Sequence, residues 1–189
     1  HLGVPVIAKV PRMKSKRRGG NTQDTNYHRV CADLMAELCV SEHLNDDRCG
    51  RSIGVIGVEV DAGASTLAIQ LAHTSAKDCK LRTVLVDADS RRRSISKAFG
   101  LNGTPGLVEL LEGASPDECL QKEGEAGLEL ISSAAESCTQ TISCSASTVD
   151  QALQTYLRDC DLLIVDLPAA SQPDRTVALT QYLDYVVVV

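Results

Sequence analysis

The stretch VEVDAGASTLAIQLA, residues 58–72, joins two elements that the sequence predicts to be of different kinds. The apolar run over 52–58 predicts a β-strand, and the apolar spacing over 65–77 predicts an amphipathic helix. A strand, a loop with glycine and a helix that opens on Ser-Thr form the frame of a phosphate-binding loop. In such a loop a lysine precedes the serine, whereas this chain has Ala64.

The residues between this strand and this helix depart further from the phosphate-loop pattern. Gly57 precedes Gly63 by six residues, which does not fit the strict spacing GxxxxGK[ST]. Loss of the lysine costs roughly 1.5–3 kcal/mol of binding, or on the order of 10²–10³ in rate if the lysine acts mainly on the transition state. Glu59 and Asp61 also place carboxylates beside any bound phosphate. Taken alone, the loop fits a tight turn without a ligand as well as it fits phosphate binding.

Strands alternate with helices along the rest of the chain. The runs RTVLVDAD (82–89) and DLLIVD (161–166) are apolar through their middle, which is typical of strands buried on both faces. Their alternation with helices predicts an α/β fold of three layers, with a mostly parallel sheet and helices on both faces. The remaining predictions are helices over 24–44, 94–99, 106–111, 148–160 and 173–183, short strands over 128–132 and 185–189, and a loop over 134–147.

Acidic side chains follow two of these strands at their carboxyl ends, where ligands bind in sheets of this kind. Asp87 and Asp89 follow the first apolar run, and Asp166 follows the second. Buried carboxylates are costly unless a cation pairs with them. Magnesium would serve, and so would the three arginines at 91–93, so both interpretations stay open.

Composition narrows the classes of protein. With 189 residues, of which 43% are hydrophobic, the chain can bury the core of one domain. A net charge of −6, no Trp and one Phe disfavour nucleic-acid binding over the surface and stacking on single strands. The 8 Cys match no zinc spacing. Since no stretch approaches the ~20 apolar residues of a membrane helix, we expect a reducing, cytosolic environment.

The N-terminal stretch differs from the rest of the chain in its charge. Lys and Arg crowd residues 9–18 and a Gly-Gly-Asn sequence follows, which predicts a basic arm over 1–23 ahead of a domain over 24–189. A solvated linker is the simpler interpretation of this arm. The sharper one is a juxtamembrane segment near anionic lipid, at about 1 kcal/mol per basic residue. Because the last predicted strand runs to the final residue, we expect a domain truncated at its C-terminal end.

Four stretches carry a resemblance to one known family. They are VPVIAKVP (4–11), VLVDADSRRR (84–93), FGLNGTPGLVELLEG (99–113) and LLIVDLPAA (162–170). Together they resemble the cytoplasmic kinase domain of bacterial tyrosine kinases (BY-kinases), the exopolysaccharide co-polymerase and chain-length regulators. The second stretch is similar to the family's acidic motif DxDxR. The resemblance implies a P-loop NTPase-like fold and transfer of the ATP γ-phosphate to tyrosine.

The resemblance also implies roles for individual residues. The implied magnesium ligands are Ser65, Asp87 and Asp166, and the implied catalytic carboxylates are Asp87 and Asp89. The implied nucleotide-binding positions are Gly57, Gly63, Ala64, Ser65, Thr66 and Arg91. ATP or ADP with magnesium is therefore the expected cofactor, bound weakly or not at all in this chain.

The departures from the family pattern point one way. Ala64 stands at the position of the family lysine, and Val60 at that of a customary proline. The family's assembly motif Glu-x-x-Arg-x-x-Arg aligns with Asn26, Arg29 and Ala32, so only its middle position is kept. This erosion argues against ring assembly and leaves a homo-oligomer open.

Three functions stay open. The first is a degenerate kinase-like domain with a regulatory role in exopolysaccharide or capsule biosynthesis or export, and with weak or no tyrosine phosphorylation. The second is an active kinase or ATPase in which one of the arginines at 91–93 replaces the lysine. The third is an adaptor that binds no nucleotide. The expected partner is a membrane-spanning polysaccharide co-polymerase segment of its own or another chain, at the cytosolic side of an inner membrane, and not a nucleic acid.

Overall fold

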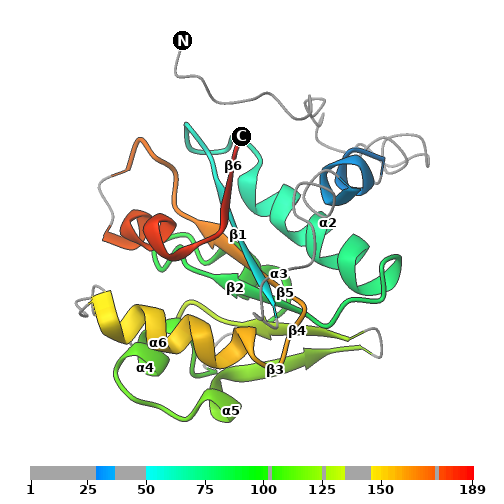
Figure 1. Ribbon diagram of the computed structural model, residues 1–189. Coiled ribbons are helices and arrows are strands. Elements are labelled where there is room, and N and C mark those ends of the chain that lie inside the picture. The colour runs from blue at the N-terminus through cyan, green and yellow to red at the C-terminus, as the bar shows by residue number, and fades with distance from the viewer. Residues whose placement is uncertain (1–28, 37–49, 102–103, 125–126, 135–145, 173–174) are drawn as a thin grey trace. The chain divides into compact units, whose positions relative to one another are not determined.

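The computed structural model describes residues 29–36, 50–101, 104–124, 127–134, 146–172 and 175–189 (Figure 1). The chain divides into two units, His1–Asp47 and Arg48–Val189. In the first unit the described residues form a helix over 29–36, which lies inside the helix predicted for 24–44. The predicted basic arm and the boundary at residue 24 lie outside the described residues.

A six-stranded sheet in the order β3-β4-β2-β5-β1-β6 forms the second unit. Its neighbouring strands are parallel, except for β3 and β4, which run antiparallel. The apolar strand β5 pairs with both β1 and β2, as expected for a strand that is buried on both faces. The strands are β1 (Arg51–Ile56), β2 (Thr83–Asp87), β3 (Leu120–Glu123), β4 (Leu128–Ile131), β5 (Leu162–Leu167) and β6 (Tyr185–Val188).

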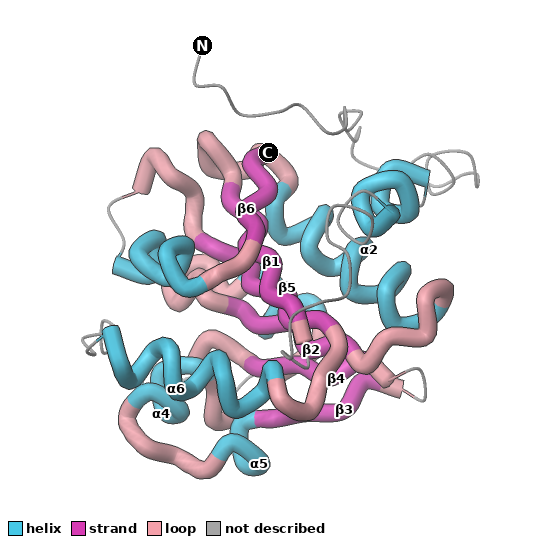
Figure 2. The backbone as a smooth tube through the Cα atoms, in the orientation of Figure 1, coloured by secondary structure: helices cyan, strands magenta, loops and turns pink. Residues whose placement is uncertain are grey.

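Helices cover both faces of this sheet (Figures 1 and 2). On one face α2 packs against β1, β2 and β5, and on the other α6 packs against β5 and α4. The mostly parallel α/β sheet between helix layers is therefore confirmed. The helices are α2 (Ala64–Lys77), α3 (Ser94–Ala98), α4 (Leu107–Leu111), α5 (Pro116–Cys119), α6 (Ala146–Leu157) and the 3-10 helix η1 (Arg175–Tyr182).

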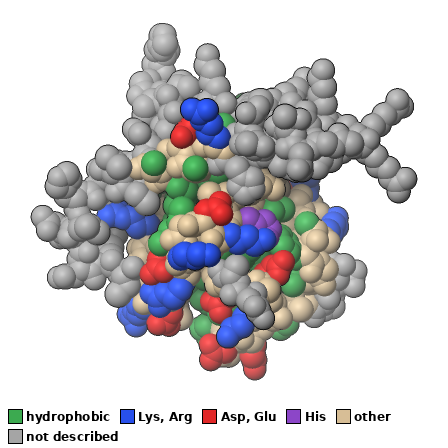
Figure 3. Space-filling view, turned by 90° about the vertical axis from the view of Figure 1, so that its right-hand side faces the viewer, with side chains coloured by type: hydrophobic (Ala, Val, Ile, Leu, Met, Phe, Trp, Pro, Cys, Tyr) green, Lys and Arg blue, Asp and Glu red, His purple; other side chains and the backbone are tan. Residues whose placement is uncertain are grey.

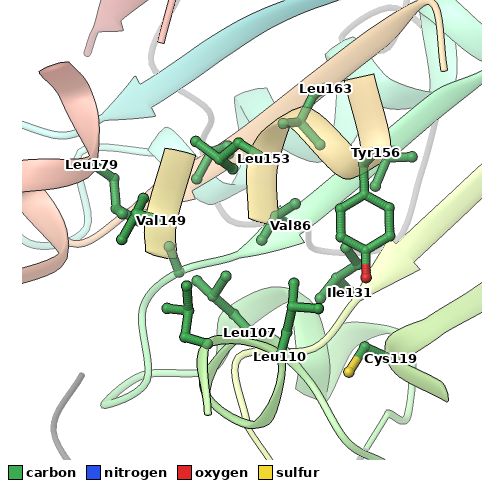
Figure 4. Packing of buried hydrophobic residues seen from close by; sticks show 14 of the residues in the cluster. Val86, Leu107, Leu110, Cys119, Ile131, Val149, Leu153, Tyr156, Leu163 and Leu179 are labelled. Atoms are coloured by element: carbon green, nitrogen blue, oxygen red, sulfur yellow. The ribbon is translucent and has the colours of Figure 1, made fainter. Parts of the chain in front are cut away.

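Successive side chains of the central strands point to opposite faces of the sheet. Val86 of β2 and Leu163 of β5 pack with Leu153 of α6 in the hydrophobic cluster of Figure 4. Side chains alternate between the faces of a strand, so Asp87 and Asp166 belong to the opposite set, on the side of α2. The two aspartates are also partners in the register of β2 and β5. Strand geometry alone thus places these two carboxyl groups next to each other.

Two short elements were not predicted. The helix α5 and the strand β3 follow one another directly, and β3 carries the polar sequence LQKE at an edge of the sheet. A polar edge strand of 4 residues lacks the apolar run on which the other strands were recognised. The helix predicted over 173–183 is a 3-10 helix where it is described, and most of the predicted loop over 134–147 lies outside the described residues.

The described surface carries charges of both signs. On the face drawn in Figure 3, acidic and basic side chains are interspersed among apolar and neutral ones. Among the helices formed by the described residues, none has both the length and the apolar composition that crossing a bilayer requires.

Candidate functional site

The loop after β1 is held by backbone hydrogen bonds on two sides. Ala170 N donates to Gly57 O at 2.8 Å, and Val58 N donates to Val189 O at 2.9 Å. The loop ends at Gly63, whose φ of 102° lies in the left-handed region that favours glycine. The loop is therefore fixed to the segment after β5 and to the end of β6, and it turns directly into α2.

The first turn of α2 offers free backbone donors. The first intrahelical bond of this 14-residue helix runs from Leu67 N to Gly63 O at 2.9 Å. No side chain caps the helix and no acidic residue lies in its first turn. Within the described part of the chain, the N–H groups of Ala64, Ser65 and Thr66 accordingly have no backbone acceptor. Free N–H groups at a helix N-terminus form an anion-binding site.

A cavity of about 340 Å³ opens at this helix end. Three loops contribute to it, and each follows a strand of the parallel sheet, as expected for ligand sites in such folds. Its lining includes Gly57, Glu59, Asp61, Gly63, Ala64, Ser65 and Thr66 from the first loop and helix, Asp89 and Arg92 from the second loop, and Leu167 and Ala169 from the third. The volume lies in the range of small-molecule sites, roughly 300–1,000 Å³.

Asp166 is fully buried and has no hydrogen-bond partner on either carboxylate oxygen among the described residues. Burial raises its pKa to about 8, with further contributions from the negative charges of Asp87 and Asp89. The Ser65 hydroxyl and the Arg92 guanidinium oppose this rise, although Ser65 stays outside hydrogen-bonding geometry. A carboxyl group in this state needs either a proton or a cation.

Asp87 is equally buried but fully engaged. Its Oδ2 accepts hydrogen bonds from Ser96 N and Ser96 Oγ, both at 2.8 Å, and its Oδ1 accepts one from Asp89 N at 3.1 Å. Burial raises its pKa, and the Ser96 donors counteract the rise. In this arrangement Asp87 ties the start of α3 to the end of β2.

Asp89 organises the loop after β2. It is 4% exposed, and its Oδ1 accepts from the backbone N–H groups of Arg91 at 3.2 Å and Arg92 at 2.9 Å. The carboxylate therefore fixes the main chain from which the arginines project. Its own side chain lines the cavity.

The three consecutive arginines point to different places. Arg92 lines the cavity, and its Nη2 donates to Asp61 Oδ1 in an ion pair. Arg93 instead donates from Nη2 to Ala134 O at 2.8 Å. Arg91 is exposed and does not belong to the cavity lining. The guanidinium in the cavity is thus that of Arg92, whereas the family resemblance implies Arg91 as the nucleotide-binding arginine.

The donor set fits a magnesium ion held mainly by water and phosphate. Oxygen ligands suit magnesium, which binds through one or two carboxylates plus substrate phosphates. The Asp166 carboxylate has no hydrogen-bond partner among the described residues and lies near Ser65, whereas both oxygens of Asp87 already accept hydrogen bonds. The described residues contain no cluster of three or more His, Cys, Asp or Glu side chains that could hold a metal alone. Ser65 and Asp166 are the better-placed ligands.

The structure brings most of the predicted positions together. Those that line one cavity are Gly57, Gly63, Ala64, Ser65, Thr66 and Asp89. The predicted positions Asp87, Arg91 and Asp166 are not part of the cavity lining, although the charges of Asp89 and Arg92 in the lining both influence the pKa of Asp166. Their roles in nucleotide and metal binding stay predictions. From the sequence, Asp61 is expected only to repel a bound phosphate. Neither its left-handed backbone, with φ of 63°, nor its ion pair with Arg92 can be predicted from the sequence.

Comparison with known sequences finds tyrosine kinases. No family model matches the chain. The tyrosine-protein kinase ptk of Acinetobacter johnsonii is 26% identical over 194 residues, covering 96% of this chain and 26% of that protein. EpsB of Ralstonia solanacearum is 27% identical over 184 residues, covering 89% of this chain and 24% of that protein. The chain thus spans about a quarter of the length of these relatives.

Solved structures of similar fold include further kinase domains. That of the Escherichia coli tyrosine kinase ETK gives a TM-score of 0.69 at 19% identity, covering 86% of this chain and 62% of that one. The VpsO kinase domain gives 0.66 at 20%, covering 88% and 79%. A plasmid partition protein of Borrelia burgdorferi B31, bound to AMPPNP, gives 0.60 at 21%, covering 74% and 62%. The resemblance to BY-kinase domains is confirmed by the sequence relatives, and the P-loop NTPase-like fold by the solved structures.

Proposed function

We propose that this domain binds nucleotide weakly, transfers phosphate little or not at all, and acts as a regulatory, kinase-like module. The observation that carries the proposal is Ala64, which places a methyl group in the cavity at the position where the family has an ammonium group. Around that methyl group the cavity is lined by Gly63, Ser65 and Thr66 at the start of α2, which supports phosphate binding there. The proposal therefore separates binding, which these parts support, from phosphoryl transfer, which needs the missing charge.

Support for residual binding comes from the α2 terminus and from Asp166. The free N–H groups of the first turn suit a phosphate. The Ser65 hydroxyl and the unpartnered Asp166 carboxylate suit a magnesium ion. When bound, magnesium would neutralise part of the phosphate charge. The chain's own contribution is to position the phosphates at the helix end and the metal beside Asp166.

Support for weakness comes from the charges in the cavity lining. Three carboxylates line the cavity, those of Glu59, Asp61 and Asp89, and they repel a polyphosphate. Within the described lining the cationic side chain is Arg92, which already pairs with Asp61. Without the lysine we expect a loss on the order of 10²–10³ in rate, by analogy with the removal of one transition-state donor.

A second candidate is an active kinase or ATPase. It is favoured by Arg92, whose guanidinium lies in the cavity and could contact the terminal phosphates, as arginine side chains do in other phosphoryl-transfer enzymes. Phosphotyrosine formed by the purified chain in the presence of ATP and magnesium would distinguish this candidate from the first.

The proposed setting is the cytosolic face of an inner membrane, in exopolysaccharide or capsule biosynthesis or export. Its support is the resemblance to BY-kinases and the basic residues over 9–18, which would favour an anionic lipid surface. The proposed partner is a membrane-spanning co-polymerase segment, of the same chain or of another. Homo-oligomers remain part of the proposal, and ring assembly does not.

Calorimetric titration with Mg-ADP and Mg-AMPPNP tests the function. We expect weak binding by the wild type and roughly 10- to 100-fold tighter binding by Ala64→Lys, because the lysine restores a charged donor. Ala62→Lys adds the same charge to the same loop at the wrong position, and it should gain much less. Micromolar binding together with strong autophosphorylation by the wild type would contradict the proposal.

A further inference from the structure

The cavity contains a cation that comes from a different loop than the missing lysine would. Arg92 belongs to the loop after β2, and Asp61 to the loop after β1. The Arg92 Nη2 group donates to Asp61 Oδ1, so one ion pair joins two loops of the cavity wall. The side chains are 37% and 78% exposed, which leaves the pair open to water and to competing anions.

Arg92 is held at its backbone by Asp89, and its half-buried guanidinium pairs with Asp61. Its N–H donates to Asp89 Oδ1 at 2.9 Å, which fixes where the side chain starts. Among the described residues, Asp61 is the acceptor that its guanidinium contacts. Arg93, by contrast, is tied to Ala134 O, away from the cavity. Arg92 can therefore exchange one anionic partner for another without moving the loop.

Asp61 presents its carboxylate from a backbone that few residues adopt. Its φ of 63° lies in the left-handed region, where Asn, Asp and Gly are tolerated best. The side chain is largely exposed, so the carboxylate makes its ion pair without being buried. Replacement by Asn keeps both the shape and the backbone preference and removes only the charge.

We propose that Arg92 is the phosphate-binding cation of this cavity, and that Asp61 is a built-in competitor that occupies it until a phosphate displaces the carboxylate. The inference rests on the proposed function and adds which side chain supplies the charge and what keeps affinity low. The exposed pair joins one guanidinium nitrogen to one carboxylate oxygen and is weak, whereas two parallel, charge-assisted hydrogen bonds would hold a phosphate. A doubly charged phosphate group therefore outcompetes a single carboxylate.

Two single variants test the roles of Asp61 as competitor and of Arg92 as phosphate-binding cation separately. In titrations with Mg-ADP, Asp61→Asn should bind about two- to fivefold more tightly than the wild type, since the ion pair no longer competes. Arg92→Gln should bind roughly 10- to 100-fold more weakly, since a charged donor is lost. Asp159→Asn and Lys97→Gln make the same charge changes at exposed positions outside the cavity lining, and their affinity should match that of the wild type.

The double variant separates competition from plain repulsion. Removal of the Asp61 charge relieves repulsion in any background, but if Asp61 acts mainly by occupying Arg92, the gain from Asp61→Asn should be clearly smaller when Arg92→Gln is already present. An equal gain in both backgrounds would mean that Asp61 merely repels phosphate, and the inference would be wrong. Thermal unfolding of each variant confirms that it is folded.

Failure of the inference differs from failure of the proposed function. If the wild type or Ala64→Lys binds Mg-ADP while Asp61→Asn binds no tighter than the wild type, only the inference falls. If the wild type, Ala64→Lys and Asp61→Asn all fail to bind at millimolar nucleotide, both fall. Binding that is seen in Asp61→Asn and lost again in the double variant supports both.

Discussion

Asp87 and Asp166 make an informative pair because their positions are matched and their surroundings are not. They are partners in the register of adjacent parallel strands, and both are fully buried. Asp87 accepts three hydrogen bonds from Ser96 and Asp89, whereas Asp166 accepts none from the described residues. A buried carboxyl group that accepts several hydrogen bonds stabilises the fold. One that accepts none is stabilised instead by binding a proton or a cation.

The largest effect is expected from Asp87→Asn. The amide has one acceptor oxygen, so either the two Ser96 donors or the Asp89 N–H would face an NH2 group and stay buried without an acceptor. We expect the free energy of unfolding to fall by about 3 kcal/mol. Urea denaturation at pH 7 measures it, and a change below about 1 kcal/mol would show that these hydrogen bonds do not stabilise the fold.

Asp166→Asn should change stability in the opposite direction. The substitution removes a buried charge that has no hydrogen-bond partner in the described part of the chain, so at pH 8 we expect a gain of about 1–2 kcal/mol. The same variant should lose the effect of magnesium on Mg-ADP affinity. A loss of stability as large as that of Asp87→Asn would mean that the two carboxyl groups play the same role.

The pH dependence of this gain has a defined sign. The pKa of Asp166 is raised to about 8 in the folded protein, above the ordinary value of 3.8. Between these values the folded state holds a proton that the unfolded state has released, so stability falls as the pH rises toward 8. The difference between Asp166→Asn and the wild type should therefore be smallest near pH 4, grow up to about pH 8 and then level off.

The smallest effect is expected from Ser96→Ala. It removes one of the three hydrogen bonds to Asp87 and the acceptor of the Ser133 N–H, which lies 3.1 Å from Ser96 Oγ. We expect a loss of about 1 kcal/mol in urea denaturation. Because the remaining bonds to Asp87 come from backbone N–H groups, the loss should stay clearly below that of Asp87→Asn. Equal losses would place the whole role of Asp87 in this one hydroxyl.

The sequence predicted the sheet better than the site. Apolar runs such as DLLIVD mark central strands, and the position of an aspartate after such a run predicts where it lies. The hydrogen bonds from Ser96 to the Asp87 carboxylate could not be predicted, because Ser96 lies on α3, nine residues further along the chain. The sequence also could not predict which of the three consecutive arginines lines the cavity. The side chains of Arg92 and Arg93 point to different partners, and the φ of 53° at Arg93 is not predictable from the sequence.

The backbone bonds on both sides of the loop after β1 have a mechanical consequence. Gly57 O and Val58 O accept from Ala170 N and Ser171 N, and Val58 N donates to the end of the chain at Val189. A shift of this loop would strain these bonds, so the cavity wall is coupled mechanically to the segment after β5 and to the residue after β6.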